Sequence, residues 1–173
     1  MAILPIVIAP DKRLKRRSKA VETVDDEIRT LLSDMLETMY DDDGLGLAAI
    51  QVGVPQRVVV IDVHEKDEPK APLKLVNPEI IWLSSERVIY EEGCLSFPNI
   101  FADVDRAAEV NVRYLDENGE AREIMAQGTL AICLQHEVDH LNGKVLVDYL
   151  SLVKRNIILR KLSKARRVQA SDE

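Results

Sequence analysis

Residues 129–141, with the sequence TLAICLQHEVDHL, decide the fold that this chain is expected to adopt. Apolar residues cover most of the circumference of a helix over this stretch, and the Asn142-Gly143 pair that follows is typical of a helix C-terminus. A helix that is apolar nearly all round is usually buried. We therefore predict a central, buried helix over 129–141.

This helix carries two histidines at positions i and i+4, His136 and His140, with Glu137 between them. Residues four apart project from one helix face, so both imidazoles can bind a single metal ion. Glu137 then lies where a carboxylate can exchange protons with a water beside the ion. A pair of core histidines with an outward glutamate is the alternative. The chain has only three histidines, however, and a buried helix needs a reason to carry His, Glu and His together.

A catalytic metal site usually has three protein ligands and an open position, so a third ligand is required. Cys94 and Cys133 are the two cysteines that compete for this role. Roughly 10 Å of helical rise separates Cys133 from His140, which is too far for a short thiol to share the ion. Cys94 follows an expected strand, and Gly93 lets the backbone come close to another group. We predict Cys94 as the third ligand and Cys133 as a small apolar residue beside the metal.

The segment 44–51, GLGLAAIQ, is rich in small residues. It lacks the features of a phosphate-binding loop, because no Lys-Ser/Thr pair follows it and no strand precedes it. Gly44 and Gly46 keep the backbone bare, so that a ligand or another strand can approach closely. The side-chain amide of Gln51 can donate to an oxyanion. A helix-ending turn followed by a tightly packed edge explains the same composition without a ligand.

The rest of the chain predicts an α+β fold, with short, mostly antiparallel strands around the central helix. Helices are expected over 25–42, where Asp25 is a candidate N-cap, and over 151–167, which is amphipathic and basic. Strands are expected over 57–63, 73–83, 86–91, 109–115 and 121–126, with an exposed loop at 64–72, a break or sheet edge at Asn77-Pro78 and a hairpin turn at 116–119. Residues 1–173 are expected to form a single domain.

The composition, with 46% hydrophobic and 31% charged residues, is that of an ordinary globular protein. Two cysteines do not make a disulfide scaffold, which favours a reducing, cytoplasmic setting. The first apolar stretch precedes the basic residues, the reverse of a signal peptide, and no apolar run is long enough to span a membrane. We expect a cytoplasmic protein without a membrane partner.

The net charge of −7 argues against a general binder of DNA or RNA. The basic residues are nevertheless clustered, with six between Lys12 and Lys19 and seven between Lys154 and Arg167. The basic C-terminal helix could meet a polyanion such as ribosomal RNA. A solvated helix face near the terminus accounts for the same charges.

Three segments, in this order, resemble those that mark the peptide deformylase family. They are Gly-x-Gly-x-Ala-Ala-x-Gln at 44–51, Glu-Gly-Cys-Leu-Ser at 92–96 and Gln-His-Glu-x-Asp-His at 135–140. The length and the basic C-terminal helix resemble the bacterial type, so the resemblance covers nearly the whole chain. It implies a metal-dependent hydrolase that removes the N-formyl group from the N-terminal methionine of newly made proteins and releases formate.

The resemblance also implies a role for each residue of the site. Cys94, His136 and His140 would hold one divalent metal ion. Glu137 would be the general base and general acid. Gln51 and the backbone N–H of Leu95 would stabilise the oxyanion.

Selectivity is expected to be steric and apolar. A tight site between the metal and the segment of Gly44, Leu45 and Gly46 would admit a formyl group and exclude an acetyl group. Ile132 and Cys133, one turn before the metal, would border the methionine side chain.

The identity of the metal and the contact to the substrate backbone each allow more than one interpretation. The resemblance implies ferrous iron, whereas thiolate and imidazole ligands by themselves favour zinc, and nickel or cobalt are further candidates. Some family members place a basic residue near position 101 to bind the substrate backbone. Phe101 cannot do so by charge.

Two other functions share these features. A zinc peptidase has the same helix motif but usually takes Glu or His as its third ligand, and cleavage of internal peptide bonds would reveal it. A structural metal site in a binding module would need four protein ligands, whereas three good candidates are found.

Overall fold

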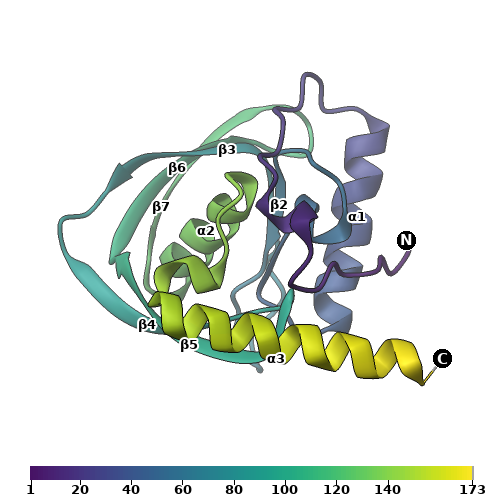
Figure 1. The fold of residues 1–173 in the computed structure, drawn as a ribbon. Coiled ribbons are helices and arrows are strands. Elements are labelled where there is room, and N and C mark those ends of the chain that lie inside the picture. Colours follow the sequence, from purple (N-terminus) through teal and green to yellow (C-terminus); the bar gives the residue numbers. More distant parts are fainter. Residues whose placement is uncertain (173) are drawn as a thin grey trace.

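Two antiparallel sheets enclose one helix in the computed structural model, which describes residues 1–172 (Figure 1). The central helix α2 (Gly128–Leu141) packs against strands of both sheets. The larger sheet has the order β1-β2-β3-β6-β7, from β1 (Gly46–Ala48), β2 (Val58–Ile61), β3 (Leu73–Leu83), β6 (Glu109–Leu115) and β7 (Ala121–Gln127). The second sheet pairs β4 (Arg87–Cys94) with β5 (Phe97–Ala107). The predicted α+β fold with a buried central helix is confirmed.

Strand β2 shows how the core is divided. Val59 and Ile61 pack in one cluster with apolar residues of α2, whereas Val58 and Val60 pack in another with residues of α1 (Asp26–Asp41). Successive side chains of a strand point to opposite faces. A strand covered by a helix on each face is therefore apolar throughout, which explains its continuous β-branched sequence.

Helix α1 begins where it was predicted to begin. The Asp25 carboxylate accepts a hydrogen bond from the N–H of Ile28 at 3.0 Å, so it caps the helix. The apolar stripe of α1 is buried against β1 and β2. After the helix, Asp43 adopts a φ of 52°, in the left-handed region, and turns the chain into β1.

The strands differ from the expectation at one place, and at another the structure decides between two alternatives. Strand β5, 11 residues long, was not predicted, because Pro98, Asn99 and several charged residues obscure its alternation of buried and exposed positions. Strand β3 is also 11 residues long and lies between β2 and β6, so Asn77-Pro78 marks a break rather than a sheet edge. The pairing of β3 with β6 shifts register there, as at a β-bulge.

Helix α3 (Leu152–Ser171) extends the predicted basic helix and crosses the molecule beside the β4-β5 sheet (Figure 1). It is anchored by Leu162, which packs with Phe97 and Ile100 of β5, and by contacts with the short helix Leu146–Tyr149. Most of its other residues are exposed. Over residues 1–172, none of the helices has both the length and the apolarity needed to cross a membrane.

Candidate metal centre and active site

The three predicted metal ligands converge, although they come from two distant parts of the chain. Cys94 ends β4, and His136 and His140 lie one turn apart on α2. Nε2 of His140 lies 3.4 Å from Sγ of Cys94 and 3.2 Å from Nε2 of His136. Ligand atoms of the three residues all lie within 4.8 Å of one another. One thiol and two imidazoles at this spacing fit a single divalent ion with one position left open.

His136 is oriented by a buried carboxylate. Its Nδ1 lies 2.8 Å from Oε1 of Glu92, on β4. Burial opposes ionisation of Glu92, but hydrogen bonds from Arg106 and His136 outweigh it and hold its pKa below the usual value. An ionised carboxylate can only accept, so Nδ1 of His136 donates and Nε2 keeps its lone pair toward the metal position.

Arg106 of β5 joins this carboxylate to Asp139, on α2. Its guanidinium donates to both oxygens of Glu92, at 2.7 and 2.9 Å, and to Oδ2 of Asp139 at 2.6 Å. It also donates to the hydroxyl of Tyr149 at 2.9 Å, and that hydroxyl contacts Asp139 in turn. Arg106 is only 4% exposed. A buried cation is thus neutralised by two carboxylates, one of which orients His136.

Glu137 is buried beside the metal position and faces the cavity. A Cβ atom placed on Gly46 would come within 2.6 Å of Oε1 of Glu137, so the glycine lets the β1 backbone lie directly against this carboxylate. Among the described residues, Oε2 of Glu137 finds no hydrogen-bond partner. Burial raises the pKa of Glu137 to about 7, although the charge of His136 opposes the shift. A carboxyl group whose pKa lies near neutral pH, and one of whose oxygens has no hydrogen-bond partner, is suited to accept and return a proton.

The Gln51 amide is held in one orientation. Its Oε1 accepts from the N–H of Ala48 at 2.9 Å, which turns Nε2 toward Ser96 Oγ at 3.1 Å and Cys94 Sγ at 3.5 Å. Leu95 lies next to Cys94, in the turn that links β4 to β5. A side-chain donor and a backbone segment therefore lie beside the thiol.

A cavity of about 560 Å³ opens over this group. The predicted substrate residues border it, and Phe101 forms part of its rim, where its side chain is exposed and lies against Gly93. The predicted residues that line the cavity are Gly44, Leu45, Gly46, Gln51, Cys94, Leu95, Ile132, Cys133, His136 and Glu137. His140 lies beneath them, 1% exposed.

Two residues around the metal ligands were missed by reasoning from the sequence. Glu92 stands in the quoted EGCLS segment, and the need of a buried histidine for an acceptor on its second nitrogen was a signal that could have found it. Arg106 had no such signal. It lies on the unpredicted strand β5, and nothing along the chain links it to α2.

A thiol and two imidazoles at the base of a cavity, with a buried carboxylate beside them, define a mononuclear metal-dependent hydrolase. Residues 3–156 match the family described as polypeptide deformylase. The chain belongs to this family and is therefore a metal-dependent hydrolase that uses a single catalytic metal.

Relatives match the chain from end to end. The peptide deformylase of Rhizobium meliloti (strain 1021) is 49% identical, and the match covers 99% of this chain and 98% of that protein. The peptide deformylase of Bartonella henselae is 50% identical and covers 100% of this chain and 98% of its own. These identities extend well beyond the three motifs.

Solved structures agree with the fold. The crystal structure of peptide deformylase from Ehrlichia chaffeensis superposes with a TM-score of 0.93 at 46% identity and covers 98% of this chain and 99% of that one. The same enzyme in complex with actinonin gives a TM-score of 0.93 at 48% identity, with 96% and 99% of the two chains covered.

Proposed function

We propose that this enzyme hydrolyses the N-formyl group from the N-terminal methionine of newly made proteins and releases formate. The observation that carries the proposal is the convergence of Cys94, His136 and His140 at the base of a cavity that Glu137 also lines. Membership of the polypeptide deformylase family supports the same reaction.

A divalent ion held by Cys94, His136 and His140 would act as a Lewis acid and would lower the pKa of a water molecule in the site. Glu137 accepts the proton of the attacking water as general base. The water oxygen bonds to the formyl carbon, and the bond from that carbon to the amide nitrogen then breaks. Glu137 returns the proton to the departing amine, so that formate and a free methionyl N-terminus are produced.

Negative charge develops on the formyl oxygen during the attack. Nε2 of Gln51 and the backbone N–H of Leu95 donate to it there, and the Gln51 amide is held in place before the reaction begins. The fixed orientation of Gln51 supports this role, because no reorganisation is needed when the charge appears.

The walls of the cavity set the selectivity. Gly44, Leu45 and Gly46 line the cavity, and Gly46 brings bare backbone directly against Glu137. The tight space beside the reacting carbon is expected to admit the hydrogen of a formyl group but not the methyl of an acetyl group. Ile132 and Cys133 form an apolar wall for the methionine side chain. Burial raises the pKa of Cys133 to about 12, so its thiol stays neutral and behaves as a small apolar group.

Ferrous iron is the proposed native ion, and zinc, nickel or cobalt could occupy the same ligands. The proposed setting is the cytoplasm. Both cysteines, which belong to the described part of the chain, are free thiols, in keeping with a reducing environment. Metal analysis of protein purified without oxygen would identify the ion.

Formate release tests the proposed reaction. Enzyme purified without oxygen is expected to release formate from a formyl-methionyl dipeptide, and a metal chelator is expected to stop it. An acetyl-methionyl dipeptide serves as the control and should not be hydrolysed. Folded, metal-loaded protein that releases no formate would exclude the reaction.

Replacing Gln51 by Ala is expected to lower kcat by about 10² to 10³-fold, the usual effect of removing one oxyanion donor. Gln51→Glu keeps an acceptor for the Ala48 N–H but places a carboxylate oxygen where the donor stood, so it should lower kcat at least as much. Steady-state kinetics on both variants would check this. Full activity in Gln51→Glu would show that Gln51 serves only to hold the backbone.

The basic helix α3 is proposed to dock on the ribosome, where formylated chains emerge. Its charges are exposed and include Arg160, Lys161 and Lys164. Reversing these three charges is expected to weaken co-sedimentation with ribosomes at low salt, whereas Lys66→Glu, in the loop after β2, should leave it unchanged. Unaltered sedimentation of the triple variant would remove the docking proposal.

A further inference from the structure

A buried carboxylate outside the metal centre, Asp62, has no part in the reaction described above. It follows β2, and its side chain is 0% exposed. Oδ2 accepts from the Tyr40 hydroxyl at 2.5 Å, while Oδ1 accepts from the N–H of Ala71 at 3.2 Å and lies 3.1 Å from Nδ1 of His64. A charge at such a position is costly unless hydrogen bonds hold it. Here hydrogen bonds from Tyr40 and Ala71, on two separate segments of the chain, hold it, and the His64 ring lies close by.

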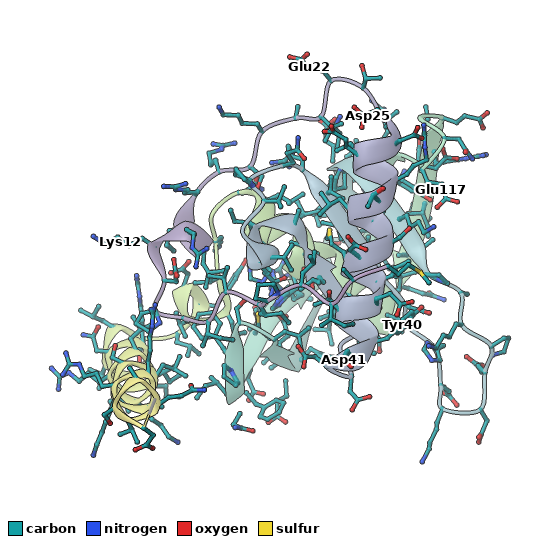
Figure 2. The ribbon with its side chains drawn as sticks, turned by 90° about the vertical axis from the view of Figure 1, so that its right-hand side faces the viewer. Lys12, Glu22, Asp25, Tyr40, Asp41 and Glu117 are labelled. Atoms are coloured by element: carbon teal, nitrogen blue, oxygen red, sulfur yellow. The ribbon has the colours of Figure 1, made fainter. Side chains whose placement is uncertain are left out.

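Tyr40 ties this carboxylate to α1. It lies in the last turn of the helix, and Figure 2 places it at the end opposite the capping residue Asp25. Its ring also lies under Lys70, whose Nζ is 3.6 Å from the ring centroid. The loop after β2 is thereby held against the end of α1 at two points.

Asp62 also holds the cavity wall directly. Its backbone N–H donates to the carbonyl of Leu45 at 2.9 Å and extends the pairing of β1 with β2 by one bond. At the other end of the wall, the N–H of Gly44 donates to the carbonyl of Met39 on α1, at 2.8 Å. The segment Gly44–Gly46 is thus hydrogen-bonded to α1 at Gly44 and to the end of β2 at Leu45. Its last residue, Gly46, lies against Glu137.

We propose that Tyr40 and Asp62 are positioning residues for the substrate wall Gly44–Gly46. The hydrogen bond between them joins the two supports of the wall, the end of α1 and the end of β2. It therefore fixes how far the wall stands from Glu137 and from the metal ligands. The effect on substrate rests on the proposed deformylase function, whereas the anchoring of the wall does not.

The test removes the hydroxyl alone. Tyr40→Phe keeps the ring under Lys70 and deletes the bond to Asp62. We expect KM for a formyl-methionyl peptide to rise about tenfold, the effect of one lost hydrogen bond, with kcat changed by less than about threefold. Amide hydrogen exchange at Leu45 and Gly46 should become faster under the same conditions. Metal content should not change.

Two further variants sharpen the result. Tyr114→Phe, on β6, is the matched control. It should leave both KM and the exchange rates unchanged, because the Tyr114 hydroxyl makes no hydrogen bond among the described residues. Asp62→Ala removes the acceptor of the Tyr40 hydroxyl and should raise KM at least as much, and adding Tyr40→Phe to it should show little further effect, since the bond is already absent.

The outcomes separate cleanly. Faster exchange at residues 44–46 together with a raised KM supports the proposal. Tyr40→Phe protein that melts at a lower temperature, with KM and local exchange unchanged, would show that the bond is merely stabilising and would overturn it. Absence of formate release in the unaltered enzyme would defeat the proposed function, while the exchange measurement would still decide whether the wall is anchored.

Discussion

Glu137→Gln is expected to lower kcat by about 10⁴-fold, the upper end of the contribution of a general acid-base group. The amide has nearly the shape of the carboxylate but can neither take the proton of the attacking water nor return it to the amine. The fold should not suffer. Burial disfavours the charged form of Glu137, and its Oε2 has no hydrogen-bond partner among the described residues, so the variant should be at least as stable.

Kinetics, metal content and thermal unfolding on one preparation would check this result. Glu91→Gln is a suitable control, because Glu91 is exposed on β4 and does not line the cavity. It should keep full activity. Turnover of Glu137→Gln within tenfold of the unaltered enzyme, at equal metal content, would show that another group moves the proton.

Arg106→Met is expected to lower the free energy of unfolding by roughly 3–5 kcal/mol, the usual effect of removing one partner from a buried ion pair. The change leaves the buried Glu92 and the half-buried Asp139 without their shared cation. Glu92 would then be a poorer support for Nδ1 of His136. Metal affinity is expected to fall by about 10- to 100-fold, as when a residue that orients a metal ligand is lost.

The same hairpin offers a matched control. Arg87 pairs with Asp105 at 2.9 Å, but their side chains are 51% and 63% exposed. Arg87→Met should therefore lower the free energy of unfolding by no more than about 1 kcal/mol and leave metal affinity unchanged. Denaturant unfolding and competitive metal titration of both variants would decide the matter. Equal effects of the two substitutions would show that burial of the Arg106 network confers no special stability or control over the metal.

Local signals were sufficient for the elements whose pattern repeats within a few residues. The start of α1 could be predicted because Asp25 precedes an apolar stripe at helical spacing, and α2 because its apolar residues run to Asn142-Gly143. Strand β5 could not, since it pairs only with β4 and carries Pro98 and Asn99 near its start. The alternation of buried and exposed residues in β5 can be recognised only when its pairing with β4 is known.

The residues of the site can likewise be divided into those that local spacing predicts and those that depend on distant parts of the chain. Spacing along α2 identified His136, Glu137 and His140, because residues one helical turn apart must share a face. It could also exclude Cys133 as a ligand, because helical rise is fixed by backbone geometry. The relative positions of side chains on α2 can therefore be predicted from the sequence.

Patterns along the chain were therefore enough to predict the buried helix, its motif and the resemblance to a family. The contacts of Arg106 with Glu92 and Asp139, and of Tyr40 with Asp62, could be found only in the folded chain. A charge becomes buried, and its partners become necessary, only when strands distant in the sequence have packed against α2 and removed the water around it.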